Sequence, residues 1–318
     1  MLRKIRFRVL APAVAVLLLL TAPVRDETVL KAGSVLDQDL SGGQVHVYRL
    51  EGQAGQNLLV TVLQDGVDVT LSVHDSGGES LGTMDAAEDR HGLERWLLST
   101  DAGEAFRIEV RSRSSEAPPG RYQIEVKELP AAAPELAAER SLTEADLLAS
   151  QEAAEPRRQA IEVYRRALGH WRELGRKPDE ARTLLRLAVA HQELGESQPM
   201  QGCLAEALLL FTALHDREGE GDTLNFLGLA QGNLGRFREA LASYERSLEI
   251  RRNLGDRHGE AITSQNVCLT RLHLGQCREA IPCYEKTILL LEEVGAPVAE
   301  ALNGLGGAYH QLGEPRKA

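Results

Sequence analysis

The sequence has few aromatic residues and few cysteines. Phe, Trp and Tyr together make up 4% of its 318 residues, which suits an array of helices packed by leucine and alanine better than a deep cofactor pocket. The cysteines all lie in the second half of the chain: Cys203, Cys268, Cys277 and Cys283. A metal site would need two close pairs at ligand spacing, or histidines on the same face, and neither pattern occurs. We therefore predict no cofactor and no metal. We expect the cysteines to be small core or surface residues, although an exported protein could oxidise them.

Recognisable catalytic motifs are also missing. The sequence contains no Gly-x-Ser-x-Gly turn, no His-Glu-x-x-His motif and no glycine-rich phosphate loop. A cysteine nucleophile needs a histidine within reach. His273 and Cys277 are four residues apart, but Leu274 and Gly275 between them predict a helix end, so the pair shares no helical face. The sequence therefore predicts that this chain is not an enzyme.

The chain lacks an excess of positive charge. Its formal net charge is −11 at pH 7, whereas a protein that binds nucleic acid normally presents a basic surface. We therefore predict no nucleic-acid partner.

The N-terminal segment has the pattern of a targeting signal. Cationic residues at positions 3, 4, 6 and 8 precede an apolar run from Val9 to Leu20, which is long enough for a signal-peptide core and too short for a typical spanning helix. Ala22 suits a cleavage site, but Leu20 and Pro23 fit it poorly. Residues 1–24 are therefore predicted to be a signal peptide or an uncleaved membrane anchor. We expect the protein to be exported, and to be periplasmic, extracellular or tethered to the membrane.

Residues 28–129 show the short alternation that is typical of strands. Runs such as Val45–Leu50 and Tyr122–Val126 alternate apolar and polar residues, and turn sequences rich in Gly, Asp and Pro separate the runs. Six to eight such strands predict an all-β sandwich or jelly roll.

Four aspartates in this region raise the question of calcium, which binds to several loop oxygens at once. They are Asp68, Asp75, Asp85 and Asp89. The simpler interpretation is that they form turns, because the sequence contains no dense Asp-x-Asp-x-Asp loop.

The strand-rich region also resembles a known family. Tyr48-Arg49-Leu50, the run from Gln64 to Leu71 and Gly120-Arg121-Tyr122 are similar to the bacterial pre-peptidase-type β-sandwich. The resemblance implies an exported protein in which this domain stands beside a peptidase or a repeat module. Residues 130–140, rich in Ala and Pro, are predicted to be the linker that follows.

From residue 141 the chain repeats itself every 40 residues. Gly195, Gly235 and Gly275 are spaced by this interval, and each follows a leucine. His215 stands where a second glycine series, at positions 175, 255 and 295, lacks a member. A fixed period of this length is typical of a helical solenoid, in which each repeat buries its apolar face against its neighbours.

The repeats resemble the tetratricopeptide repeat, in a 40-residue form with an extended second helix. The residues that carry this resemblance are Leu227-Gly228, Gly235, Ala240, Tyr244 and Leu248. The small Gly228 and Ala240 are expected to let the two helices of the repeat approach closely.

Residues 141–318 are thus predicted to be an all-α tetratricopeptide repeat solenoid. Its last repeat begins at Ala301 and is cut short at Ala318, so we expect the chain to be a fragment of a longer protein. The uncapped end of such a solenoid exposes the face meant for the next repeat, which leaves self-association open.

The tetratricopeptide resemblance implies that a partner binds in the concave groove, which the first helix of each repeat lines. The residues predicted to face this groove are Arg182, Leu185, Val189, Asn225, Leu229, Asn233, Gln265, Leu269, His273 and Asn303. Asn and Gln side chains can hold the backbone of an extended peptide, and the leucines supply apolar contact. The simpler alternative is that these residues are a solvated surface. The groove lacks the Lys/Arg cluster with which chaperone-binding members of the family clamp a C-terminal carboxylate.

Two functions remain open at this point. The first is a non-catalytic protein–protein interaction scaffold, exported or membrane-tethered, that binds a protein or peptide in the groove. The alternative is the regulatory N-terminal part of a CHAT-type (caspase-like) cysteine peptidase. The order of export signal, pre-peptidase-like domain and 40-residue repeats resembles bacterial proteins that continue into a CHAT domain, which this chain does not contain.

Overall fold

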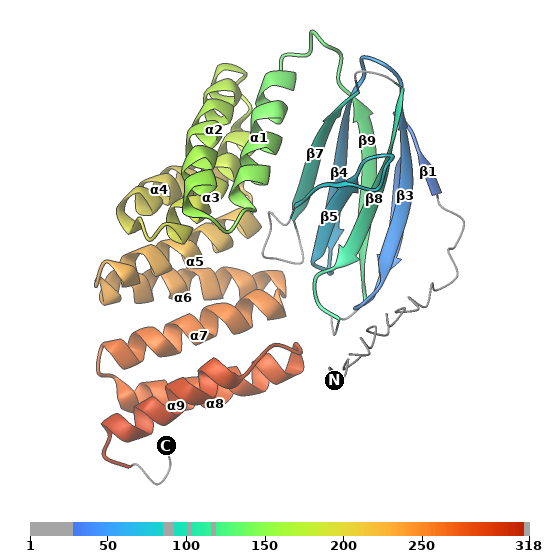
Figure 1. The fold of residues 1–318 in the computed structure, drawn as a ribbon. Coiled ribbons are helices and arrows are strands. Elements are labelled where there is room, and N and C mark those ends of the chain that lie inside the picture. The colour runs from blue at the N-terminus through green and yellow to red at the C-terminus, as the bar shows by residue number, and fades with distance from the viewer. Residues whose placement is uncertain (1–27, 85–91, 101–102, 116–118, 315–318) are drawn as a thin grey trace, which may run out of the picture.

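The computed structural model shows a strand-rich part followed by a helical part (Figure 1). It describes residues 28–84, 92–100, 103–115 and 119–314. The predicted signal or anchor segment, residues 1–24, lies outside the described residues, as do Asp85 and Asp89. Among the described residues, no helix is both long enough and apolar enough to cross a membrane.

The strand-rich part, called the β-domain below, comprises the described residues between 28 and 129. Its strands are β1 (Thr28–Leu30), β2 (Val35–Leu40), β3 (Val45–Gly52), β4 (Asn57–Asp65), β5 (Val69–His74), β6 (Ser80–Met84), β7 (Leu93–Ser99), β8 (Glu104–Ser112) and β9 (Gly120–Glu128). One sheet has the order β1-β3-β8-β5-β6 and the other the order β2-β9-β4-β7. Alternate residues of both sheets, such as Val60, Trp96, Ile108 and Ile124, share one buried core. The predicted strand-rich N-terminal region is confirmed.

Helices make up the rest of the described chain. They are α1 (Leu136–Ala149), α2 (Ala154–Glu173), α3 (Lys177–Glu193), α4 (Ser197–Leu214), α5 (Arg217–Asn233), α6 (Phe237–Leu254), α7 (Arg257–His273), α8 (Cys277–Glu293) and α9 (Ala299–Gln311). Successive helices pack as pairs, and α3, α5, α7 and α9 also contact one another in that order. The first helices of the pairs therefore lie side by side along one face of the stack.

The helix ends follow the predicted 40-residue period. Gly235 after α5 has a φ of 74°, and His215 after α4 has a φ of 57°, so both adopt the left-handed conformation that reverses the chain at a helix end. His215 is the only residue other than glycine with a positive φ among the described residues, at the position where the glycine series lacks a member. The predicted turn at this position is confirmed.

The small residues bring the paired helices together as predicted. A Cβ added to Gly228 would lie 2.7 Å from the ring of Tyr244, which packs on it from α6. Gly304 of α9 lies against Tyr284 of the preceding helix α8 in a similarly tight way, because an added Cβ would lie 2.4 Å from the Tyr284 hydroxyl. The close approach of these neighbouring helices thus depends on the absence of a side chain at Gly228 and Gly304.

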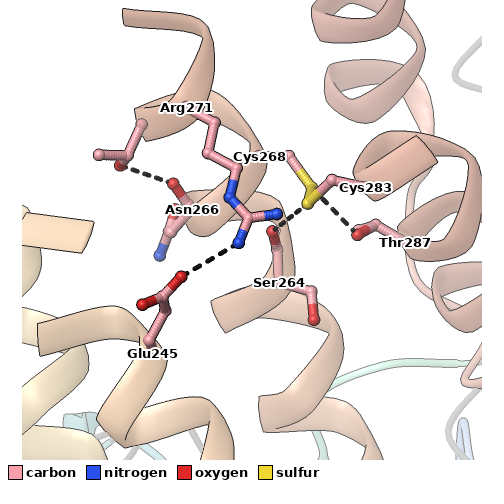
Figure 2. The surroundings of a disulfide bond; sticks show 8 residues. Glu245, Ser264, Asn266, Cys268, Arg271, Cys283 and Thr287 are labelled. Atoms are coloured by element: carbon pink, nitrogen blue, oxygen red, sulfur yellow. Dashed lines mark hydrogen bonds and ion pairs between the residues drawn. A yellow bond between two sulfur atoms is a disulfide. The ribbon is translucent and has the colours of Figure 1, made fainter. Parts of the chain in front are cut away.

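Two of the cysteines form a disulfide, which corrects the expectation that they are separate core or surface residues. Cys268 of α7 and Cys283 of α8 are bonded, with their Cα atoms 5.6 Å apart (Figure 2). Cys268 occupies the position of Gly228 one repeat earlier, and this position faces the second helix closely enough for a bridge. Cys203 and Cys277 are free thiols.

The segment predicted as a linker, residues 130–140, is partly helical and is packed against the β-domain. Helix α1 already begins at Leu136, which is buried together with Leu129 and with Leu59 and Leu97 of the sheet. The Ala/Pro composition suggested a solvated connector, but Leu136 anchors the segment by apolar burial. The helical and strand-rich parts are therefore in direct contact.

Candidate functional site

A cavity of about 910 Å³ lies between the β-domain and the first helices of the repeats. The β-domain contributes residues of β4, β6 and β7, and each of the helices α1 to α7 contributes at least one residue. Its apolar lining consists of Leu63, Met84, Leu93, Ala149, Leu185, Val189, Ala190, Phe211, Phe226 and Ile262. A concave space of this size with mixed apolar and polar walls is the default candidate for a binding site.

Strand β7 explains how the β-domain is held beside the helices. Its residues alternate, so that Leu93, Arg95 and Leu97 point away from the core that contains Trp96 and Leu98. Leu97 is buried against α1, Arg95 forms ion pairs with the helices, and Leu93 lines the cavity. The outward face of β7 is therefore buried against α1 at Leu97 and lines the cavity at Leu93.

Helices α1 and α3 also satisfy hydrogen-bonding groups of this sheet edge. The Leu97 backbone N–H donates to Thr143 Oγ1 at 3.1 Å, and the Leu93 carbonyl accepts from Arg186 Nη2 at 3.2 Å. An edge strand without such partners would present free backbone groups to solvent or to other chains. In Figure 1, α1 stands directly beside β7.

A buried network of charges joins the two parts. Arg95 lies 3.0 Å from Glu139 of α1 and 2.9 Å from Asp179 of α3, with both carboxylates almost completely buried. Burial raises the pKa of Glu139, and the guanidinium of Arg95 opposes that rise. Asp179 also pairs with Arg176 at 3.0 Å, so Arg95 is the partner that the two carboxylates share, and its loss would leave buried charge poorly compensated.

A second buried group lies at the floor of the cavity. Asp146 of α1 forms an ion pair with Arg186 of α3 and accepts a hydrogen bond of 2.6 Å from the Tyr164 hydroxyl. Burial raises the pKa of Asp146, while Arg186 and the Tyr164 hydrogen bond act in the opposite direction. Since all three residues line the cavity, the charges of this part of its wall are paired.

The charged side chains on the cavity walls are paired as well, with one exception. Arg157 lies 2.8 Å from Glu193, and Arg251 lies 2.6 Å from Asp222. Arg182 of α3 is exposed and has no ion pair or hydrogen bond from its side chain to another described residue. The cavity therefore offers one guanidinium that is available to a bound molecule.

Asn225 of α5 lines the cavity, and its side-chain oxygen is held by a neighbouring residue. The Asn266 side-chain amide donates to Asn225 Oδ1 at 3.1 Å, which fixes the orientation of the Asn225 amide. Its Nδ2 group then remains as a donor, and a peptide carbonyl is the matching acceptor.

The structure divides the residues that were predicted to face the groove into two sets. Four of them line the cavity, namely Arg182, Leu185, Val189 and Asn225. The other six lie outside the cavity lining, namely Leu229, Asn233, Gln265, Leu269, His273 and Asn303. No observation tests whether either set contacts a partner, so their role stays a prediction.

The second set has neighbours of its own farther along the first helices. Gln265 donates to Glu300 at 2.6 Å, and the His273 ring stacks on Phe237 with 4.9 Å between the ring centroids. Leu269 is exposed. These residues form an open surface rather than a cavity wall.

The sequence did not indicate that the β-domain would contribute to this site. Leu63, Thr83, Met84 and Arg113 line the cavity from the β-domain side. Leu63 carried the only available signal, because it is a large apolar residue at an outward position of a strand. Its 50% exposure shows that no element of the described chain covers it completely.

The described residues contain no group of three or more His, Cys, Asp or Glu side chains that could hold a metal ion. Asp75 forms a turn, because its side chain accepts hydrogen bonds from the backbone N–H groups of Gly77 and Glu79. Asp68 forms an ion pair with Arg113. These two aspartates are thus engaged within the β-domain.

Comparisons with known proteins agree with the helical architecture. The family model described as "Tetratricopeptide repeat" matches residues 223–257, which is one repeat. The TPR-like repeats of a putative kinesin light chain from Podosopora anserina are 16% identical over 57% of this chain and 90% of that chain, with a TM-score of 0.50. This likeness shows a TPR-like fold. A search of curated protein sequences found no match.

Two further solved structures are similar to parts of the chain. BtubC from P. vanneervenii is 20% identical over 57% of this chain and 84% of that chain, with a TM-score of 0.49. The pre-peptidase C-terminal domain of a collagenase from Bacillus anthracis is 18% identical over 32% of this chain and 98% of that domain, with a TM-score of 0.27. The CHAT part of the sequence resemblance remains a prediction.

The repeats support a general conclusion about function. Tetratricopeptide repeats and TPR-like folds imply a role in protein–protein interaction, and the repeat fold itself is typically non-catalytic.

Proposed function

We propose that this chain is a non-catalytic scaffold that binds an extended segment of a partner protein in the cavity between the first helices and the β-domain. The observation that carries the proposal is the cavity itself, which is lined by four of the residues predicted from the repeat pattern. Leu185 and Val189 offer apolar contact, and Asn225 offers a fixed donor to the backbone of the partner.

We also propose that the protein works outside the reducing cytosol. The Cys268–Cys283 disulfide supports this location, because structural disulfides persist in oxidising compartments and are rare in the cytosol. The cationic and apolar sequence at the N-terminus supports export in the same direction. The resemblance of the β-domain to the exported pre-peptidase type is a third argument for it.

The proposal is tested by capture of partners on the immobilised chain. The double variant Leu185→Gln/Asn225→Ala removes apolar contact and the amide donor from the cavity. The matched control Leu209→Gln/Asn253→Ala makes the same changes at exposed positions of α4 and α6, outside the cavity.

We expect the cavity variant to lose the proteins captured from extracts of the source cells, while the control retains them. Circular dichroism of both variants should show unchanged helix content. Equal capture by the cavity variant and the wild type would overturn the assignment of function to this cavity.

A further inference from the structure

We propose that the β-domain is one wall of the binding site, and that the composite cavity selects a peptide carrying an acidic side chain next to an apolar one. This inference rests on the proposed function and specifies its ligand. It is argued from the exposed apolar face of β4, from the fixed junction and from the charges of the cavity.

The outward face of β4 carries one apolar residue that is not buried by packing within the described chain. Leu59, Thr61 and Leu63 alternate on the face that points away from the β-domain core. Leu59 is 8% exposed because Leu129 and Leu136 cover it, whereas Leu63 is 50% exposed at the cavity wall. An apolar side chain at this position is suited to contact with a bound molecule.

The wall that contains Leu63 is fixed relative to α3. Arg95 of β7 forms an ion pair with Asp179 at the start of α3, and Arg186 in the middle of α3 donates to the Leu93 carbonyl of β7. Strand β7 is in turn paired with β4 along its whole length, including Leu63 with Leu93. The two walls can therefore recognise one ligand together, because little ordering is required when it binds.

The charge distribution indicates what kind of ligand fits. Each acidic side chain that lines the cavity already has a partner: Asp146 with Arg186, Glu193 with Arg157, Asp216 with the Gly219 N–H, Asp222 with Arg251, Asp65 with Arg121, and Glu218, which is also engaged. Within the described chain, Arg182 is the lining cation without a partner. The guanidinium of Arg182 is thus available to a bound molecule, and a carboxylate complements it.

The spacing on α3 determines the arrangement of the ligand. Arg182, Leu185 and Val189 are at i, i+3 and i+7, so they lie on one face of the helix, with Arg182 and Leu185 about 4.5 Å apart along its axis. An extended peptide advances about 3.3 Å per residue. A peptide with an acidic residue one or two positions from an apolar residue therefore places its carboxylate near Arg182 and its apolar group between Leu185 and Leu63.

The test is selection of binding peptides from a phage-displayed library of random peptides on the full chain. Selected sequences are synthesised with a free and with an amidated C-terminus, labelled, and titrated by fluorescence anisotropy. We expect Asp or Glu next to an apolar residue in the selected sequences, and equal affinity for both forms. A requirement for the free C-terminus would assign Arg182 to a terminal carboxylate and would overturn the side-chain assignment.

Variants of the two walls test the composite site. Leu63→Glu and Arg182→Gln should each weaken the selected peptides by about tenfold or more, as expected for central interface residues. The matched controls Val35→Glu on β2 and Arg238→Gln on α6 change exposed residues outside the cavity and should leave affinity unchanged. Arg182→Glu should restore binding to a peptide in which Lys replaces the acidic residue.

The outcomes separate this inference from the proposed function. If Leu185→Gln/Asn225→Ala abolishes binding while Leu63→Glu and Arg182→Gln do not change it, the groove binds peptides but the composite site is wrong. If none of these variants changes the affinity, the proposed function fails as well. A library that yields no binding peptide would overturn the peptide assignment, and the capture experiment would then decide the proposed function.

Discussion

The two ends of the described helical stack are stabilised by different means. At the first end, α1 and α3 are joined to the β-domain by buried charges around Arg95 and Arg186. At the other end, α7 and α8 are joined to each other by the Cys268–Cys283 disulfide (Figure 2). The pair α5 and α6 between them has neither the contact with the β-domain nor a disulfide, and is joined by the packing of Tyr244 on Gly228 and by the ion pair of Arg251 with Asp222.

This difference shows what the repeat pattern determines. Contacts that recur every 40 residues build each helix pair, as in the ion pairs of Glu180, Glu220 and Glu260 with a cation three residues earlier. Contacts that do not recur attach a particular repeat to something else. The cavity lies at the end where the non-recurring contacts join the helices to the β-domain.

The largest expected effect comes from breaking the junction at the first end. Arg95→Met should lower the free energy of unfolding by about 3–5 kcal/mol, because it leaves the buried carboxylates of Glu139 and Asp179 without their shared partner. Arg107→Met on β8 is the matched control, since Arg107 forms an exposed pair with Glu109 and should contribute at most about 1 kcal/mol. Urea unfolding followed by circular dichroism measures both. Equal effects of the two variants would show that the junction does not stabilise the fold.

Removal of the disulfide tests the other end. The double variant Cys268→Ala/Cys283→Ser replaces the disulfide between α7 and α8 with small residues, like those at the same positions of other repeats. For a sequence separation of 15 residues, loss of the bond should cost about 3 kcal/mol. Hydrogen exchange should show this loss in α7 and α8 and not in α3. Cys203→Ser is the control, and unchanged exchange in α7 after removal of the bond would contradict the account.

The middle pair is tested by adding a methyl group at two glycines of α5. Gly228→Ala should destabilise by about 1–3 kcal/mol, because the new Cβ would lie 2.7 Å from the Tyr244 ring. Gly232→Ala meets no atom within 4 Å and should stabilise by up to about 1 kcal/mol through higher helix propensity. Thermal unfolding of the two variants measures the contrast. If both variants shifted the unfolding temperature in the same direction, the contact between Gly228 and Tyr244 would not be as tight as the structure shows.

The smallest expected effect is a pH dependence at the junction. Burial raises the pKa of Glu139 above its ordinary value of 4.5. A carboxyl whose folded pKa is raised contributes stability below the unfolded pKa and loses that contribution as the pH rises through the folded pKa. The unfolding free energy of the wild type should therefore fall relative to that of the Glu139→Gln variant as the pH rises from 4.5. Urea titrations at several pH values measure this difference, and an opposite trend would contradict it.

The sequence alone was sufficient to predict a strand-rich part followed by helical repeats. The turn at His215 was predicted from its place in the glycine series, and the packing at Gly228 and Ala240 was predicted from residue size. Both follow from local patterns that repeat along the chain. Four of the ten groove residues were placed near the cavity by the same periodicity.

The junction and the disulfide were missed because they depend on pairings between distant residues. Arg95 and Asp179 are 84 positions apart, and Leu97 and Thr143 are 46 apart. One signal was present in the sequence. Asp179 stands where the next two repeats have Gly219 and Gly259, and Cys268 replaces the small residue Gly228, so departures from the repeat mark contacts that the repeat itself does not make.

The central claim is that the β-domain and the first repeats form one unit with the cavity between them. It is tested most directly by hydrogen exchange of the Leu97 amide, which lies on the outer edge of the sheet and donates to Thr143 of α1. We predict that this amide is protected like those of β4, and that Thr143→Val reduces its protection without affecting β4. Exchange of Leu97 at the rate of a free edge amide would show that α1 is not docked on β7, and the account of the cavity would be wrong.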